Sequence, residues 1–309
     1  MESGLLPTIN SQLIQLESES GARALRRDVL SAISTTLKRY TGSRERENLL
    51  LEILNLYNLF MACRPRMSLL IHDLQRLVVF LHEHADADAE ALKQYVEVIR
   101  REKRAQMERC QTQLIDLLAG QRRVLLHSHS STILGAFKIA AERQIRPEVL
   151  IAAQDPKKTN QVITALAASG HSFKVVSEYS VSHVLEDVDI ALFGALSLTR
   201  NGQFIAGPGV ANLINHLRVA DVARYPVMTT DKFSFWESYT KPTYEETRAK
   251  RLEDLDYEKV VFSHDTFNIK SITALVTDLG ILDHAGIERA FDTQQAEFFE
   301  NERKIQQLQ

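Results

Sequence analysis

The chain has 309 residues, of which 44% are hydrophobic and 25% charged, and this composition is typical of a folded globular protein. A formal net charge of −3 gives no reason to expect a nucleic acid as partner. The length allows two domains of ordinary size. The composition therefore excludes a disordered chain and argues against a nucleic-acid-binding protein.

The cysteine pattern and the apolar segments bear on the compartment in which the chain works. The two cysteines, Cys63 and Cys110, form no CxxC pattern, which favours a reducing compartment. The first 20 residues lack the basic start and long apolar core of a signal peptide. The richest apolar run, residues 49–63, is shorter than the roughly 20 residues of a membrane span. We expect a cytoplasmic protein without a membrane partner.

Residues 1–120 have the periodicity of helices and almost no strand signal. Apolar residues recur every three or four positions over residues 22–40, 46–60 and 67–85, as on one face of a helix. A long, charged, proline-free segment follows and stops at Gly120, a favourable helix end. The pattern predicts a helical bundle as the first domain.

From residue 121 onward, short apolar segments alternate with helical ones. We expect the strands at residues 123–128, 148–153, 172–177, 188–195, 225–230 and 259–264. Helices are predicted at residues 131–143, 156–169, 179–186 and 209–220. This alternation predicts an α/β domain over residues 121–309, with a Rossmann-like, mostly parallel open sheet and helices on both faces. Ligands of such sheets bind beyond the carboxyl ends of the strands, so the residues that follow each strand are the candidate site.

The segment "HSHSST", residues 127–132, follows the first predicted strand. Ser130, Ser131 and Thr132 either cap the next helix only or form the start of a phosphate site. His127 and His129 are two residues apart, but a zinc site needs more ligands and the spacing suggests no third. We therefore predict no metal here.

Other strand ends carry polar groups and glycines. Gln154, Lys157 and Lys158 lie around an Asp-Pro helix start, where the two lysines either face an anion or belong to a solvated first turn. Gly207 and Gly209 let a ligand approach the backbone or simply form a tight turn. Each strand end therefore has a structural and a functional interpretation.

Asp231 and Lys232 follow the strand predicted at residues 225–230. The nearby Phe233, Phe235 and Trp236 are expected to bury against the helical half or a second subunit. No GxGxxG, P-loop, GxSxG or HExxH pattern occurs anywhere in the chain. The motifs therefore support neither a P-loop nucleotide site, nor nucleophilic hydrolysis, nor a metallopeptidase.

Four segments together resemble a known family. They are "VLLHSHSSTIL", "VDIALFGALSLTRNGQFIAGPGVANL", "TTDKFSF" and "SITALVTDLGIL". Over roughly residues 122–290 the chain resembles the alpha, beta and delta subunits of translation initiation factor 2B. It also resembles the related isomerases of methylthioribose 1-phosphate and ribose 1,5-bisphosphate. The resemblance implies a helical N-terminal domain and a Rossmann-like C-terminal domain that dimerises.

The resemblance also bears on catalysis. The isomerases use a cysteine and an aspartate, and the matching positions of this chain are Ser128 and Leu196. The family's Asn-Lys pair is replaced by Ala206 and Gly207. Isomerisation of an aldose phosphate needs a group that moves a proton near neutral pH, which a leucine cannot do. The resemblance therefore implies a non-catalytic regulatory or scaffold protein without a cofactor, with no catalytic residue to assign.

The predicted ligand is a phosphorylated sugar or nucleotide. The candidate contacts are Ser128, His129, Ser130, Gln154, Lys157, Gly207, Gly209, Asp231 and Lys232. The predicted partners are a second copy of the chain, bound through the C-terminal domain, and other proteins.

Two alternatives stay open. An aldose–ketose isomerase acting on a pentose phosphate would use His129, Asp231 and Asp265. A nucleic-acid-associated protein would use the basic residues of 100–109, although Glu102 and Glu108 favour a solvated helix face there.

Overall fold

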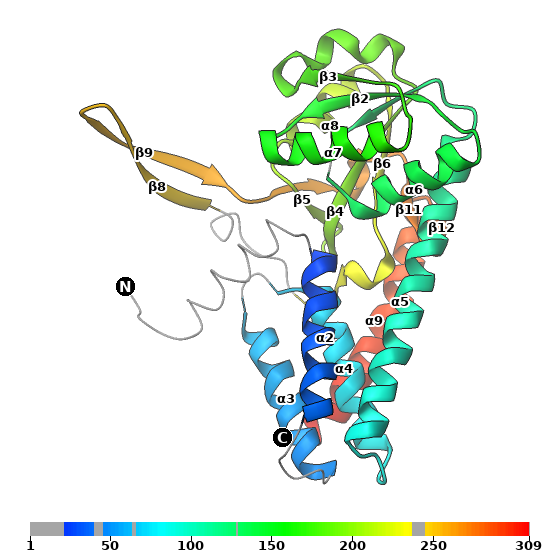
Figure 1. Cartoon of the computed structure of the whole chain (residues 1–309), viewed down its shortest axis with the longest axis vertical. Helices are drawn as coiled ribbons and strands as arrows, with labels where there is room; N and C mark the ends of the chain where they lie inside the picture. The colour runs from blue at the N-terminus through cyan, green and yellow to red at the C-terminus, as the bar shows by residue number, and fades with distance from the viewer. Residues whose placement is uncertain (1–21, 40–45, 64–65, 128, 237–244, 309) are drawn as a thin grey trace. The chain divides into compact units, whose positions relative to one another are not determined.

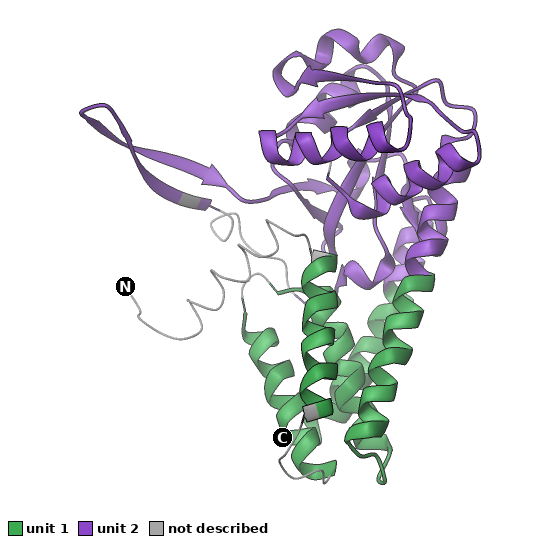
Figure 2. Ribbon diagram, in the orientation of Figure 1, with its two compact units in different colours: residues 1–105, 292–309 green, residues 106–291 purple. Residues whose placement is uncertain are grey.

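The structure is a computed structural model, and it describes residues 22–39, 46–63, 66–127, 129–236 and 245–308. It divides into two compact units (Figure 2), which are residues 1–105 with 292–309, and residues 106–291. Helix α5 (Ala89–Leu118) runs through this division. The domain boundary expected at residue 120 stays a prediction.

The first unit is helical (Figure 1). It contains α2 (Ala22–Arg39), α3 (Arg46–Ala62), α4 (Ser68–Glu83), part of α5 and the end of α9 (His284–Gln306). The four leucines predicted to share a face of α4 are all 1% exposed or less, namely Leu70, Leu74, Leu77 and Leu81. The apolar stripe predicted from the sequence is therefore the face that α4 buries in the core of this unit.

The second unit contains a sheet in the order β12-β11-β6-β4-β1-β2-β3. The strands are β1 (Arg123–Leu126), β2 (Glu148–Ala153), β3 (Phe173–Ser177), β4 (Ile190–Thr199), β6 (Ala223–Val227), β11 (Leu275–Thr277) and β12 (Gly280–Leu282). All neighbours along this path are parallel except the β11–β12 pair. The predicted mostly parallel α/β fold is confirmed.

Helices cover both faces of this sheet because successive side chains of a strand point to opposite faces. The helical elements are α6 (Ser131–Glu142), α7 (Pro156–Ala168), the 3₁₀ segment η1 (Glu178–Asp187) and α8 (Val210–Val219). Val124 and Leu126 of β1 pack in one core cluster with α5, α6 and α7. Leu125 packs in the other cluster, with η1 and α8.

The carboxyl-terminal part of β4 extends past its parallel neighbours and pairs with two short strands, one of which pairs with a third. These are β5 (Gln203–Ala206), β7 (Phe233–Ser234) and β10 (Asp265–Asn268), with the short 3₁₀ turns η2 (Thr230–Lys232) and η4 (Ile269–Ser271) beside them. The predicted burial of the aromatic residues holds, but Phe233 and Phe235 pack on Phe291, which belongs to the same unit.

One predicted strand belongs to a different sheet from the one expected. Residues 259–264 were expected in the parallel sheet, but residues 259–262 belong to β9 (Leu255–Phe262), which pairs with β8 (Glu245–Leu252) in a separate hairpin. Strand β11 occupies the sixth parallel position instead. Central parallel strands are buried on both faces, and β9 carries Asp256, Glu258 and Lys259, which would be costly to bury there.

Candidate functional site

The site lies where the chain order reverses in the sheet, between β1 and its neighbour β4. Crossovers lead away from this point in both directions, and ligands of open α/β sheets bind at such a switch point, at the carboxyl ends of the strands. His127 follows β1 directly, and its backbone N–H donates to the Leu192 carbonyl of β4 at 3.1 Å. The imidazole is fully buried, so a titratable ring stands at the switch point.

Two polar side chains face this ring. The Gln154 amide nitrogen, after β2, lies 3.5 Å from His127 Nδ1. A carboxylate oxygen of Glu178, which follows β3, lies 3.6 Å from Nε2. Within the part of the chain that the structure describes, Nε2 has no hydrogen-bond partner. The three residues come from three successive strand ends and form one cluster.

The glycine-rich turn at residues 207–209 packs against the cluster of His127, Gln154 and Glu178. Gly209 is the N-cap of α8 and has φ of +94°, in the left-handed region that favours glycine. A side chain there would also overlap the Glu178 carboxylate. At Gly207, an added Cβ would meet the Gln154 amide at 3.9 Å. The close approach that the sequence predicted at Gly209 is thus made by the protein's own carboxylate.

Asp265 caps the start of α8 from a distant strand. Its Oδ2 accepts hydrogen bonds from the backbone N–H groups of Gly209 at 2.9 Å and Ala211 at 3.1 Å. Free N–H groups at a helix start are what would bind a phosphate. Since Asp265 takes two of them and Glu178 packs on Gly209, this helix start already holds two carboxylates.

Basic groups gather at the rim formed by the loops after β1, β2 and β9. Lys158 lies in the first turn of α7, 3.9 Å from Asp155 of the same turn. Burial and the Lys158 ammonium lower the pKa of His264 to about 4. The same two causes lower the pKa of His129, while Asp155 opposes them. An anion bound here would face one ammonium and two imidazoles.

The outer part of β4 carries Leu196. It is partly buried at the irregularity between Ala195 and Ser197 in the pairing with β5. Lys232 Nζ donates to the Ala195 carbonyl at 2.8 Å. Asp231 is 4% exposed and accepts a hydrogen bond from the Thr229 hydroxyl at 2.6 Å.

The predicted site residues therefore fall into separate groups. Gln154, Gly207 and Gly209 converge on His127, while His129 lies on the basic rim. Asp231 and Lys232 form hydrogen bonds around the outer part of β4. The remaining three do not join the cluster: Ser130 caps α6, Lys157 is exposed, and Ser128 lies outside the described residues.

Sequence reasoning missed Glu178 and His264 as site residues, and it kept Lys157 rather than Lys158 among the candidate contacts. Glu178 stands directly after a predicted strand, which is a usable signal, whereas its contact with His127 depends on the strand order. The sequence does not tell which of Lys157 and Lys158 faces the strand ends, because this depends on the exact residue at which α7 begins.

No group of three or more histidine, cysteine, aspartate or glutamate side chains among the described residues could hold a metal ion. No helix of the described chain is both long and apolar enough to cross a membrane.

Solved structures share this fold. Translation initiation factor eIF-2B from Pyrococcus horikoshii OT3 superimposes with a TM-score of 0.71 at 19% identity, over 90% of this chain and 98% of that one. The 5-methylthioribose 1-phosphate isomerase of the same organism gives 0.70 at 15% identity, over 92% and 88%. The tetrameric eIF2B-beta2-delta2 complex from C. thermophilum gives 0.68 at 14% identity, over 93% and 95%. Both neighbours named in the resemblance are therefore similar in fold.

The sequence relatives carry the same family description as the first of these structures. A putative translation initiation factor eIF-2B subunit 2-like protein of Pyrococcus abyssi is 26% identical over 165 residues, which are 52% of this chain. A protein with the same description from Pyrococcus horikoshii is 25% identical over 164 residues. The match spans only 57% of the length of either relative. A model of the initiation factor 2 subunit family matches residues 18–284, and the chain belongs to this family.

Proposed function

We propose that this chain is a non-catalytic, regulatory or scaffolding member of the family. In this proposal the switch point between β1 and β4 binds a small phosphorylated molecule without converting it. The second unit would also carry the contact to a second copy of the chain, and the protein would act in the cytoplasm with further protein partners.

The observation that carries the proposal is that the acidic side chains near the carboxyl ends of β1 and β4 form structural hydrogen bonds. Leu196 supplies no proton-transferring group at the isomerases' aspartate position. Asp265 accepts two backbone N–H groups of α8, so protonating it would weaken the start of that helix. Asp231 is buried with a hydroxyl donor. Two of the three groups of the isomerase alternative are thus engaged in holding the fold.

The basic rim supports an anionic ligand. Lys158 is close enough to His129 and His264 to lower the pKa of both rings, so these groups share one region of positive potential. A phosphate there would pair with the ammonium and favour protonation of the rings. The capped start of α8 contributes less, because its backbone donors already bind a carboxylate.

The test is a thermal-shift and calorimetric screen against sugar phosphates, nucleotides and sulfate. A ligand that binds only the native state raises the unfolding midpoint. We expect Lys158→Ala to weaken the best ligand about tenfold, or about 1.4 kcal/mol. Lys157→Ala is the matched control, since it removes the same charge from an exposed neighbouring position, and its effect should be small.

Either of two results would reject this proposal. One is the absence of any ligand that raises the midpoint of the wild-type protein. The other is turnover of a ligand, measured by the appearance of a ketose signal in proton nuclear magnetic resonance spectra.

One observation favours the isomerase as a second candidate. The buried His127 ring lies 3.6 Å from the Glu178 carboxylate, and such a pair can take up and return a proton. If ketose forms from a pentose phosphate, Glu178→Gln should abolish that turnover while ligand binding persists.

A further inference from the structure

The β8–β9 hairpin is a sheet of its own within the second unit. Its eight residue pairs run from Glu245 opposite Phe262 to Leu252 opposite Leu255, and it joins no other strand of the described chain. All described side chains of residues 245–260 are exposed. A lone two-stranded hairpin is only marginally stable in water, so a partner that covers it would stabilise it.

The two faces of the hairpin treat their cations differently. Residues directly opposite each other in an antiparallel pair point to the same face. One face carries Arg248 opposite Lys259, with Lys250 on the same side of β8. The other carries Arg251 opposite Asp256, and this guanidinium lies 3.8 Å from that carboxylate. Within the part of the chain that the structure describes, no carboxylate pairs with Lys250 or Lys259, so we call their side the basic face.

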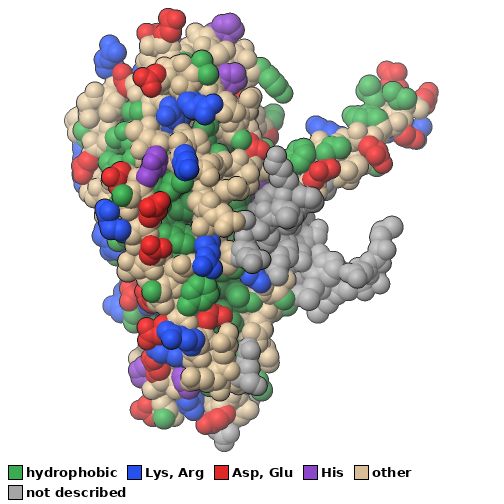
Figure 3. Space-filling view, turned by 180° about the vertical axis from the view of Figure 1, so that it is seen from behind, with side chains coloured by type: hydrophobic (Ala, Val, Ile, Leu, Met, Phe, Trp, Pro, Cys, Tyr) green, Lys and Arg blue, Asp and Glu red, His purple; other side chains and the backbone are tan. Residues whose placement is uncertain are grey.

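The basic face ends in apolar side chains at the turn. Leu252 and Leu255 lie opposite each other there, and Tyr257 is the next residue of β9 on the same side. The three side chains are 64%, 65% and 45% exposed, and Figure 3 shows apolar side chains gathered along the hairpin. An exposed apolar patch bordered by charged groups is typical of an interaction surface. The face is therefore basic at one end and apolar at the other.

A nucleic acid would satisfy only part of this surface. Phosphates would neutralise the lysines and a base would stack on Tyr257, but both leucines would stay in water. The turn beyond the leucines consists of Glu253 and Asp254, which repel phosphates. A peptide supplies carboxylates, apolar side chains and also backbone groups, which can pair with the edges of the hairpin that lack a strand partner in the described chain. The surface thus favours a peptide over an RNA.

We propose that the basic face of the β8–β9 hairpin binds an extended acidic segment of a different protein. Carboxylates of the segment then lie beside Lys250 and Lys259, and its apolar side chains cover Leu252, Leu255 and Tyr257. Like charges opposite each other destabilise a strand pair, and an anion next to Lys259 relieves its repulsion with the neighbouring cation. The proposal rests on the proposed function, which includes protein partners, and names the surface and the chemistry of one of them.

The experiment selects binders from random peptides displayed on phage, with the full chain as the target. The enriched peptides should carry more acidic than basic residues, together with apolar ones. A target with both Lys250→Glu and Lys259→Glu should enrich basic peptides instead, because the charge of the face is reversed.

Fluorescence anisotropy then measures the affinity of the most enriched peptide. Lys259→Glu should weaken binding about tenfold, because like charges then meet. The same substitution places a carboxylate opposite Arg248 and should stabilise the hairpin, so an unfolded hairpin cannot explain the loss. Arg251→Glu makes the same charge change on the other face and is the matched control, with a change within about twofold.

Leu255→Ala separates a peptide partner from an RNA. It removes apolar surface that a bound peptide covers, so it should weaken the peptide about fivefold. Single-stranded oligouridylate is the RNA probe. It should not displace the peptide from the wild-type chain.

Three results would overturn the proposal: enriched peptides without an excess of acidic residues, an affinity that Lys259→Glu leaves unchanged, or displacement of the peptide by oligouridylate. The last result, with no effect of Leu255→Ala, would assign the face to RNA. A small ligand that still raises the unfolding midpoint would keep the proposed site between β1 and β4 in each case. Peptide binding without any such ligand would reject that site and leave the hairpin contact in place.

Discussion

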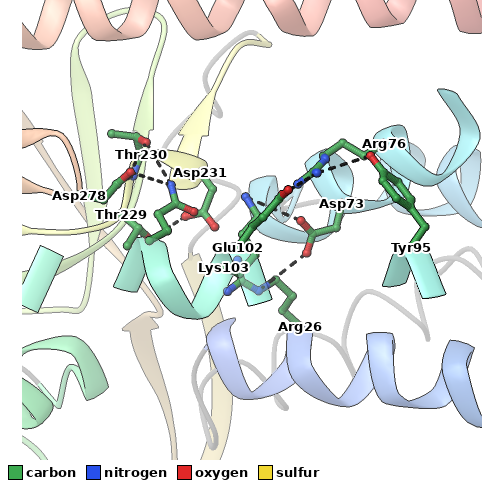
Figure 4. A network of polar contacts seen from close by, with 11 residues as sticks. Arg26, Asp73, Arg76, Tyr95, Glu102, Lys103, Thr229, Thr230, Asp231 and Asp278 are labelled. Atoms are coloured by element: carbon green, nitrogen blue, oxygen red, sulfur yellow. Dashed lines mark hydrogen bonds and ion pairs between the residues drawn. The ribbon is translucent and has the colours of Figure 1, made fainter. Parts of the chain in front are cut away.

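The two units hold their buried carboxylates in different ways (Figure 4). In the helical unit, Asp73 of α4 is fully buried, with Arg26 at 3.8 Å and Lys103 at 3.9 Å. In the α/β unit, Asp278 accepts hydrogen bonds from the Thr230 N–H at 2.7 Å and the Gln106 amide at 3.0 Å. The first unit thus surrounds a carboxylate with cations, and the second provides uncharged donors.

The difference concerns the buried carboxylates, since both units also form ion pairs at their surfaces. A carboxylate paired with cations neutralises them, so the helical unit holds its opposite charges together in its core. Carboxylates that bind backbone and amide groups neutralise no cation. At the rim of the α/β unit, Lys158 lies 3.9 Å from Asp155 and still lowers the pKa of both His129 and His264.

The largest effect is expected at Asp73. Replacing it with Asn removes the charge but keeps the shape, which leaves the guanidinium of Arg26 and the ammonium of Lys103 largely buried without their carboxylate. Breaking a buried pair in this way costs about 3 to 5 kcal/mol. Urea unfolding followed by circular dichroism should show this loss in the free energy of unfolding.

The control for Asp73 lies on the same unit. Glu102 pairs with Arg76 at 2.6 Å, but its side chain is 51% exposed. Pairs of this kind contribute roughly 0 to 1 kcal/mol, so Glu102→Gln should be nearly neutral. Equal losses for the two variants would remove the distinction between the buried and the exposed pair.

The second effect concerns pH and the rim of the α/β unit. The folded-state pKa of His264 is about 4, below its ordinary value of 6.5, so the folded protein favours the neutral ring. This contribution to stability is complete above pH 6.5 and is lost as the pH falls toward 4, because the unfolded chain binds the proton first. We expect a loss of about 2 kcal/mol between pH 7 and pH 5.

His264→Gln should remove this part of the pH dependence, as measured by urea unfolding at both pH values. Burial and the Lys158 ammonium lower the pKa of the ring, and the Ser263 hydroxyl lies 2.9 Å from its Nδ1, so Lys158→Ala should reduce the slope as well. A slope that neither variant changes would mean that the histidine is freely solvated in the folded protein.

The sequence predicts most of the fold because the local patterns agree with the final structure. The stripe of Leu70, Leu74, Leu77 and Leu81 and the strands around residues 123–128 and 148–153 follow from spacing alone. The hairpin was misplaced because its apolar residues resemble those of a buried strand, and only the sheet shows that β11 takes that position. Local composition cannot report which of two candidate strands pairs with β6.

The site is less predictable for the same reason. Gln154, Gly207 and Gly209 were found because each follows a strand or begins a helix. The contact of Glu178 with His127 joins residues 51 positions apart and requires the order β3-β2-β1. Asp265 was considered as a catalytic group, whereas its bonds to Gly209 and Ala211 depend on the pairing of β10 with β5.

The smallest effect is expected at Asp265, where the α/β unit uses a carboxylate as a helix cap. Gly209 has no side chain with which to cap α8, so Asp265 replaces that function from β10. Asp265→Ala should cost about 1 to 2 kcal/mol, typical of a lost cap, and Asp265→Asn less, because its amide oxygen can still accept a hydrogen bond. Urea unfolding of the three proteins gives these differences. Since the removed carboxylate binds uncharged groups, neither variant leaves a buried cation behind, and both should stay well below the loss at Asp73. A loss of 3 to 5 kcal/mol for Asp265→Asn would show instead that the charge itself is required. The two units would then hold their carboxylates by the same means.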